Sequence, residues 1–320
     1  MTDPLLSIRG LTVRVGGHDG APAILEDVDL DVGRAETVGL VGESGSGKST
    51  LGAAILRLTP GRLAEGTRGE IRWKDSDLLT LSPRRMRRVR GREISMILQD
   101  PMSSLNPVQS VGAQVREALA RAGRGGRDSA AALLDEVRIP APEERLSAYP
   151  HQMSGGMRQR VVTAIGLAQD PALIVCDEPT TALDATVQVQ ILDLLRSLKD
   201  AHGMSMLFIT HDFGVVARIC DRVAVMYAGR IVETGPVADI FRAPAHPYSR
   251  ALLAAVPRTT DRPDRLPAIE GQPPGVGARP SGCPFRTRCP KATDACLSMP
   301  DVTRPGPGRT LRCHHPESPA

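Results

Sequence analysis

The sequence predicts an α/β fold in which a parallel β-sheet carries a nucleotide site at one edge, and two observations support this prediction. A glycine-rich loop, Gly42 to Thr50, stands between an apolar run typical of a buried strand, Thr37 to Val41, and a helical pattern, Leu51 to Leu58. A second apolar run, Leu173 to Asp177, ends in a carboxylate. A buried parallel strand that brings an acid to the ligand-binding edge of a sheet has this pattern.

The glycine-rich loop reads Gly-Glu-Ser-Gly-Ser-Gly-Lys-Ser-Thr and has the strand, loop and helix context that a phosphate loop requires. Its glycines let backbone amides turn toward phosphate groups, the amine of Lys48 offers a positive charge to the β and γ phosphates, and the hydroxyl of Ser49 can bind Mg²⁺. The predicted nucleotide-binding residues of the loop are Gly42, Ser44, Gly45, Gly47, Lys48, Ser49 and Thr50.

The acidic pair Asp177-Glu178 follows the second apolar run directly. Asp177 is the expected partner of Mg²⁺, and Glu178 is placed to orient and polarise an attacking water. An isolated Asp-Glu pair is more often solvated in a loop, but the order of the motifs in this chain favours the catalytic interpretation.

Ser154-Gly155-Gly156 is a second candidate anion site, at the start of a predicted helix. Backbone amides and a hydroxyl at a helix N-terminus point toward negative charge. One chain therefore carries two phosphate-binding surfaces.

In this order the motifs resemble the ATP-binding cassette (ABC) family. The resemblance implies an ABC-type P-loop NTPase, with a RecA-like core, an antiparallel β lobe and a helical subdomain. It places the nucleotide-binding domain at residues 1–255, with the helical subdomain at about 102–160. It also implies that each ATP lies between the phosphate loop of one subunit and the Ser-Gly-Gly turn of another, so that the protein works as half of a dimer.

The resemblance assigns roles to three further residues. Gln99 corresponds to the glutamine that reaches Mg²⁺ and water while its loop touches the membrane partner, and His211 corresponds to the histidine that contacts the γ-phosphate. Asp184 belongs to the loop that connects the two composite sites across the dimer. The catalytic residues implied are Glu178, His211 and Gln99.

Two departures from the common family pattern are informative. The signature usually continues with Gln where this chain has Met157, and the run Ser154 to Arg160 is similar to one of the two ATPase subunits of bacterial dipeptide and oligopeptide permeases. This implies a heterodimer with a sibling ATPase, two transmembrane permease subunits and, indirectly, an extracytoplasmic solute-binding protein. Val15 stands where many relatives have an aromatic ring that stacks on adenine, so GTP remains open as an alternative to ATP.

Composition narrows the function classes. The chain has 320 residues, of which 41% are hydrophobic, 2% are aromatic and 24% are charged, with a net charge of +4. So few aromatic side chains argue against stacking on single-stranded nucleic acid, and no nucleic acid partner is expected. The arginine-rich run Arg84 to Arg92 is interpreted as a solvated helix face, with contact to anionic lipid or a membrane subunit as an alternative.

No run of 18 apolar residues is present, and the N-terminal residues do not have the pattern of a signal peptide. The predicted location is therefore the cytoplasmic face of the cell membrane, reached through the membrane subunits.

Residues 256–320 form a Pro-, Gly- and Arg-rich extension with four of the six cysteines. The extension resembles the C-terminal region of peptide-importer ATPases. Its thiols suggest a metal or cluster that folds a segment with little core of its own. The spacing favours a [4Fe-4S] cluster, with Zn²⁺ or uncoordinated thiols as alternatives, and His314 or His315 could replace one ligand. The predicted ligands are Cys283, Cys289, Cys296 and Cys313, whereas Cys176 and Cys220 are expected in the core.

The function implied is the ATP-hydrolysing subunit of a di- or oligopeptide importer. Two alternatives remain open: the ATPase of an importer for nickel or another small solute, and an ABC ATPase that acts on DNA or ribosomes without a membrane partner.

Overall fold

The computed structural model describes residues 3–18, 20–181, 183–256 and 268–317. The chain forms two compact units. The first unit comprises residues 1–33, 37–80 and 208–320, and the second comprises residues 34–36 and 81–207. The domain boundaries given above, at residue 255 and at about residues 102 and 160, stay predictions.

The first unit contains a four-stranded antiparallel sheet in the order β2 (Ala23–Val32), β1 (Leu6–Arg14), β4 (Thr67–Trp73) and β5 (Ser76–Asp77). Strand β1 pairs Ile8 with Leu30 of β2 and with Ile71 of β4. These three side chains are almost fully buried, because residues that pair directly across strands lie on the same face of the sheet. Trp73 is only 2% exposed and belongs to the core.

The first unit also contains strands in the order β11 (Thr310–Leu311), β10 (Arg230–Pro236), β9 (Arg222–Tyr227) and β3 (Thr37–Val41). Strands β3 and β9 are parallel, whereas β9–β10 and β10–β11 are antiparallel. The phosphate loop follows β3, and α1 (Lys48–Ile55) follows the loop. The other helices of this unit are α2 (Gly61–Glu65), α10 (Phe213–Ile219), α11 (Val237–Arg242), α12 (Pro247–Ala254) and a 3₁₀ turn at Asp294–Leu297.

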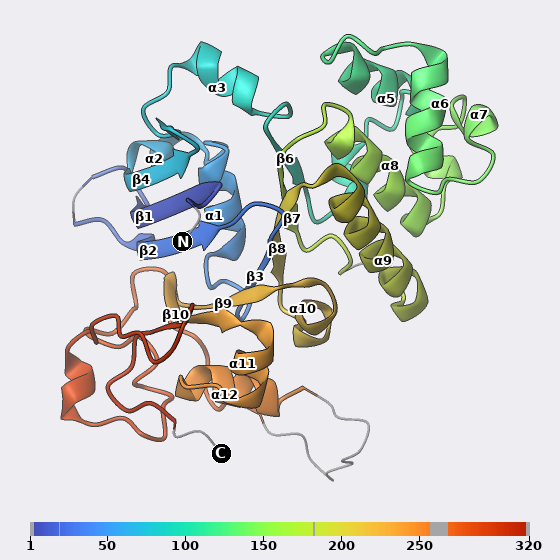
Figure 1. Cartoon of the computed structure of the whole chain (residues 1–320). Helices are drawn as coiled ribbons and strands as arrows, with labels where there is room; N and C mark the ends of the chain where they lie inside the picture. Colours follow the sequence, from blue (N-terminus) through green and yellow to red (C-terminus); the bar gives the residue numbers. More distant parts are fainter. Residues whose placement is uncertain (1–2, 19, 182, 257–267, 318–320) are drawn as a thin grey trace. The chain divides into compact units, whose positions relative to one another are not determined.

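The C-terminal segment, residues 268–317, has a core that it shares with the rest of the first unit. Phe285 is 1% exposed and packs with Tyr227 and Tyr248, at ring-centroid distances of 5.2 Å in both cases. The same cluster contains Val225 of β9 and Ile240 of α11. Figure 1 shows this segment, coloured orange to red, beside β10, α11 and α12. Hydrophobic burial therefore folds the segment onto the unit.

The second unit contains the parallel strands β6 (Ile94–Ile97) and β7 (Leu173–Asp177). Its longer helices are α5 (Val111–Ala120), α6 (Arg127–Glu136), α8 (Gly155–Leu167) and α9 (Ala185–His202), which lie together in Figure 1. Shorter helices are α3 (Pro83–Val89), α4 (Pro101–Ser104), α7 (Pro142–Arg145) and a 3₁₀ turn at Pro150–Gln152. Strand β8 (Ser205–Thr210) contains the point where the chain passes from the second unit to the first.

Within the described part of the chain, no helix combines the length and the apolar character needed to cross a membrane.

Candidate functional site

The phosphate loop is a tight turn that only glycine can form at two positions. A Cβ atom on Gly42 would lie 2.1 Å from the carbonyl oxygen of Met226, and one on Gly47 would lie 2.7 Å from Cδ2 of Leu25. Gly47 also has φ of 103° and caps the N-terminus of α1. The close approach of backbone to backbone and the left-handed conformation explain why glycine is required here.

Lys48 closes the turn from inside. Lys48 is 5% exposed, and its amine donates hydrogen bonds to the carbonyl oxygens of Gly42 (2.8 Å) and Glu43 (3.1 Å). The lysine charge is therefore held beside the loop backbone at the start of a helix, where a phosphate group is favoured. Ser44, Gly45 and Ser49 are exposed, and Thr50 is half-buried.

The carboxylates of the second unit lie at the end of β7. Asp177 is buried at the last position of the strand, and Glu178 follows with φ of 47°. A left-handed conformation at a residue with a side chain is strained by about 1–2 kcal/mol and is often found at functional sites.

The side chain of Glu178 is held from two directions. Thr181 donates its hydroxyl to Oε2 of Glu178 at 2.9 Å, and Gln99 donates its amide to the same oxygen at 3.4 Å. Gln99 comes close because β6 and β7 are parallel neighbours that pair Ile97 with Cys176. The pairing of these two strands thus brings Gln99 and Glu178 together, although 79 residues separate them in the sequence.

The Ser-Gly-Gly turn begins helix α8, which has 13 residues. Ser154 is the N-cap, and its hydroxyl accepts a hydrogen bond from the backbone amide of Met157 at 3.3 Å. A Cβ atom on Gly156 would lie 2.6 Å from Cγ1 of Val187, so this glycine allows α8 to approach α9 closely. A Cβ on Gly155 would make only ordinary contact, at 3.5 Å from Leu183.

Asp184 is the N-cap of α9, and its carboxylate accepts a hydrogen bond from the amide of Val187 at 3.0 Å. The starts of α8 and α9 therefore meet at Val187. Sequence reasoning did not identify this cap, although an Asp followed by a helical pattern is a recognisable signal for one.

His211 follows β8 and is exposed, and Val15 is 42% exposed after β1. These two residues belong to the first unit with the phosphate loop, whereas Gln99, Ser154, Asp177, Glu178 and Asp184 belong to the second.

The phosphate loop also has partners that sequence reasoning missed. The backbone amide of Glu43 donates to the hydroxyl of Tyr248 at 2.9 Å, and Arg288 forms an ion pair with the Glu43 carboxylate at 2.7 Å. Arg288 lies in the extension that resembles peptide-importer ATPases, but nothing in the sequence connects either partner with the loop.

The prediction of an iron–sulfur or other metal site in the C-terminal segment is wrong. Among the residues that the structure describes, no group of three or more His, Cys, Asp or Glu side chains could hold a metal ion. Cys283 and Cys296 are buried in the aromatic and aliphatic cluster, and Cys289 packs against it. The expectation rested on a segment with little core of its own, whereas this segment shares a hydrophobic core with the rest of the first unit.

The electrostatic setting of the thiols agrees with this correction. Burial raises the pKa of Cys283 and Cys289 and raises the pKa of Cys313 to about 11, which favours the neutral thiol over the thiolate that metals bind. The two histidines have other partners, since the ring of His315 hydrogen-bonds Thr293 at 2.6 Å and that of His314 hydrogen-bonds the carbonyl of Ser298 at 3.2 Å. Cys176 is fully buried, as expected of a core residue, and burial raises its pKa to about 12.

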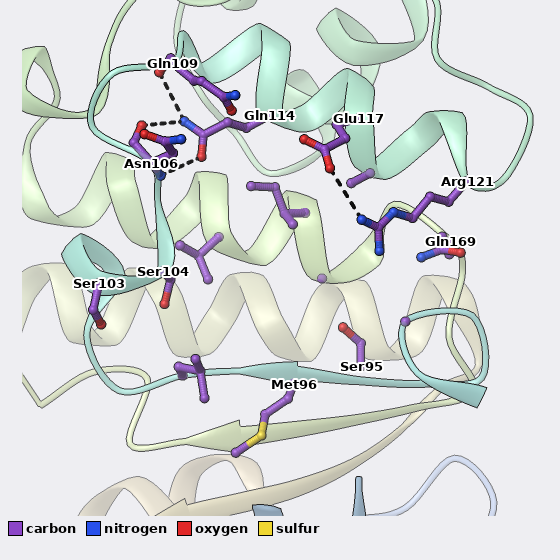
Figure 2. A pocket seen from close by; sticks show the side chains of 16 residues that line it. Ser95, Met96, Ser103, Ser104, Asn106, Gln109, Gln114, Glu117, Arg121 and Gln169 are labelled. Atoms are coloured by element: carbon purple, nitrogen blue, oxygen red, sulfur yellow. Dashed lines mark hydrogen bonds and ion pairs between the residues drawn. The ribbon is translucent and has the colours of Figure 1, made fainter. Parts of the chain in front are cut away.

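A cavity of about 640 Å³ opens in the second unit between β6, the loop after it, α5 and α8. Figure 2 shows the side chains that line it. Gln114 holds the loop beside it, because its side-chain amide accepts from the amide of Asn106 (2.9 Å) and donates to the carbonyl of Gln109 (3.1 Å). The lining includes Leu98, which precedes Gln99 and is 45% exposed.

Comparison with known proteins identifies the family. The ABC transporter family model matches residues 25–181, and the model of the oligopeptide/dipeptide transporter C-terminal region matches residues 232–296. The chain is 46% identical to a putative peptide import ATP-binding protein of Brucella abortus (strain 2308), over 98% of this chain and 95% of the relative. It is 45% identical to the dipeptide transport ATP-binding protein DppD of Bacillus subtilis (strain 168), over 97% and 92% of the two chains.

A solved structure of the ATP-binding cassette MJ0796, a dimer in a post-hydrolysis state bound to ADP and phosphate, is similar over 72% of this chain and 98% of that chain. The sequence identity is 26% and the TM-score is 0.62. This similarity supports the predicted cassette fold. On these sequence and structural matches, the chain belongs to the ABC transporter family of ATP-hydrolysing cassettes, within the group of peptide-import ATP-binding proteins.

Proposed function

We propose that this chain hydrolyses ATP at the cytoplasmic face of the cell membrane and thereby powers the import of di- or oligopeptides. The observation that carries the hydrolytic part is the setting of Glu178, a carboxylate oriented by Thr181 and Gln99 at the end of a buried strand. The peptide substrate is supported by the names of the relatives, which are peptide or dipeptide import proteins.

In the proposed reaction Glu178 orients the attacking water and accepts its proton. Lys48 and the loop amides bind the β and γ phosphates, His211 contacts the γ-phosphate, and Val15 contacts the adenine. Gly42, Ser44, Gly45, Gly47 and Thr50 complete the loop, as expected from the sequence.

Ser49, Gln99 and Asp177 would hold Mg²⁺. Their hydroxyl, amide and carboxylate oxygens are the donor types that this ion prefers, so the donor set fits. When bound, Mg²⁺ supplies positive charge that offsets the charge on the phosphates.

The Ser154-Gly155-Gly156 turn is proposed to bind the nucleotide held by a sibling ATPase. Ser154 and Gly155 are exposed at the N-terminus of a 13-residue helix, which favours an anion. In this arrangement Asp184, at the start of α9, lies near the same interface. The Met157 variant of the signature supports a heterodimer, in which the sibling carries the glutamine form.

The cavity beside Leu98 is proposed to receive a segment of a permease subunit. It lies next to the loop that carries Gln99, so occupation of the cavity and orientation of Glu178 can influence each other. The solute-binding protein would act only indirectly, through the permease subunits.

Purification of the chain together with the membrane subunits that accompany it, followed by reconstitution in lipid vesicles, tests the transport function. We expect ATP-dependent uptake of labelled di- or oligopeptides. Uptake of Ni²⁺ but not peptides would support the alternative solute, and binding to DNA or ribosomes without any hydrophobic subunit would contradict the transport function.

The substitution Glu178→Gln tests the hydrolytic role within the same complex. Because Gln cannot accept the water proton, turnover should fall by roughly a hundredfold or more while ATP remains bound. The matched control is Glu144→Gln in α7, where the carboxylate is exposed. Unchanged turnover in the Glu178 variant would contradict the assignment.

A further inference from the structure

Glu43, the second residue of the phosphate loop, is held at all three of its polar groups. Its backbone amide donates to the hydroxyl of Tyr248 at 2.9 Å, and its carbonyl accepts from the amine of Lys48 at 3.1 Å. Its two carboxylate oxygens accept from the two terminal nitrogens of Arg288, at 2.7 and 3.1 Å. Two of these partners, Tyr248 and Arg288, therefore come from the C-terminal part of the chain.

Arg288 is itself fixed on every side, and its side chain is only 4% exposed. It donates to the carbonyl oxygens of Glu270 (2.8 Å), Ile269 (3.2 Å) and Gly271 (3.2 Å). Its guanidinium lies 5.8 Å from the ring centroid of Tyr227 and donates a hydrogen bond to the Tyr227 hydroxyl at 3.3 Å. A planar donor group with this many fixed acceptors holds its anionic partner in one orientation.

Tyr248 is equally rigid. Its side chain is fully buried, with ring centroids 4.6 Å from Tyr227 and 5.2 Å from Phe285. The phenol therefore presents its oxygen to the amide of Glu43 at a fixed position.

We propose that Arg288 and Tyr248 are positioning residues for nucleotide binding: they fix the first turn of the phosphate loop and neutralise the Glu43 carboxylate. Without Arg288, a negative charge one residue beyond Gly42 would stand uncompensated in the loop that must bind a polyanion. Repulsion between the carboxylate and the phosphates would then weaken binding.

This proposal concerns nucleotide binding alone and needs neither a permease subunit nor a peptide. Its failure can therefore be told apart from failure of the transport function.

Titration of the full-length chain with ATP and Mg²⁺, followed by calorimetry, tests the proposal. Arg288→Ala should raise the Kd for ATP by roughly tenfold, because one full charge close to the phosphates is left uncompensated. Arg288→Lys keeps the charge but loses the paired hydrogen bonds, so the Kd should lie between those of the wild type and the alanine variant. Arg286→Ala is the matched control, since this neighbouring arginine donates to the carbonyl of Ser281 in the same segment.

A double variant separates charge compensation from a general role of Arg288 in folding. In the Glu43→Gln background the carboxylate is absent, so Arg288→Ala should raise the Kd by less than about twofold. In ATP hydrolysis the effect of Arg288→Ala should appear in KM, with kcat nearly unchanged, because the loop binds the nucleotide and does not activate the water.

Three results would overturn the proposal: a wild-type Kd in folded Arg288→Ala, an equal loss of affinity in the Glu43→Gln background, or a fall in kcat without a rise in KM. If Arg288→Ala does not fold, Arg288→Lys and Tyr248→Phe decide the question. A wild-type Kd in both would refute the positioning role, and a rise of roughly twofold to fivefold in both would support it.

Discussion

The phosphate loop and the Ser-Gly-Gly turn are both backbone turns at helix N-termini, but they are held in different ways. Ser154 is held locally, by a hydrogen bond to the amide of Met157 three residues later. Glu43 of the phosphate loop is held by Tyr248 and Arg288, which follow it by 205 and 245 residues. The conformation of the first turn therefore depends on distant parts of the chain, whereas that of the second is encoded close to it.

The largest expected effect comes from breaking the core that supports the distant partners. Phe285→Ala removes a ring that is 1% exposed between Tyr227 and Tyr248. Loss of apolar burial and the cavity left behind should lower the free energy of unfolding by about 3–5 kcal/mol. Urea unfolding measures the change. Leu297→Ala in the same segment is the control, because Leu297 is 54% exposed, and an equal loss in both variants would contradict the assigned core.

A smaller effect is expected from the buried ion pair between β10 and the C-terminal segment. Glu233 is 1% exposed and accepts from Arg309 at 2.9 Å and from the amides of Ala245 (2.8 Å) and His246 (3.0 Å). Arg309→Ala leaves the carboxylate with its amide donors but without its counter-charge, so the free energy of unfolding should fall by about 2–3 kcal/mol. Exposed Arg304→Ala serves as control, and a matching loss there would show that the pair itself is unimportant.

The contrast between local and distant contacts also explains which parts of the fold and of the site can be predicted from the sequence: those whose requirements lie within a few residues. Strands β3 and β7 were placed at their observed residues, since each is a short apolar run next to a motif. The loop glycines and the start of α8 were likewise readable, because their requirements lie within a few residues. The approach of Gln99 to Glu178 could not be derived in this way, because it depends on the pairing of two strands that lie far apart in the sequence.

The C-terminal segment was misjudged for the opposite reason. Its cysteines were visible as a spacing, but the aromatic side chains that bury them come from β9, α12 and the segment itself. No local pattern shows that Tyr227, Tyr248 and Phe285 meet. The Pro- and Gly-rich composition therefore predicts a segment with little core of its own, whereas the structure gives it a core built with distant residues.

Ser154→Ala tests the local side of the comparison. Loss of the N-cap should lower the free energy of unfolding by about 1 kcal/mol, and Ser154→Gly should lower it by only a few tenths of this amount. Hydrogen exchange should quicken at the amide of Met157 and the first turn of α8, with no change at the phosphate loop. Faster exchange at Glu43 would mean that the two turns are not independently held.

The smallest effect is expected at His202, whose contacts are distant in sequence but near solvent. Its ring nitrogens lie 2.6 Å from Glu136 and 2.8 Å from Asp170, and the Asp170 side chain is 66% exposed. Partial burial lowers the pKa of His202, but the hydrogen bonds and charges of the two carboxylates outweigh it, so the pKa is raised overall. The contribution of protonated His202 to the free energy of unfolding is therefore fully present below the unfolded-state pKa of about 6.5. It is lost as the pH rises through the higher folded-state pKa.

The stability difference between wild type and His202→Gln should accordingly be largest near pH 6 and decline toward pH 9, and it should stay below about 1 kcal/mol because solvent screens the carboxylates. Urea unfolding across this pH range measures it. In a Glu136→Gln, Asp170→Asn background the difference should lose its pH dependence. If the stability difference between wild type and His202→Gln grows with pH, the neutral His202 ring, and not the protonated one, is the favoured partner of the two carboxylates. The change in the free energy of unfolding caused by His202→Gln should be much smaller than the change caused by Arg309→Ala. This result would mean that burial of a charged pair sets its strength, and that the distance between its residues along the chain does not.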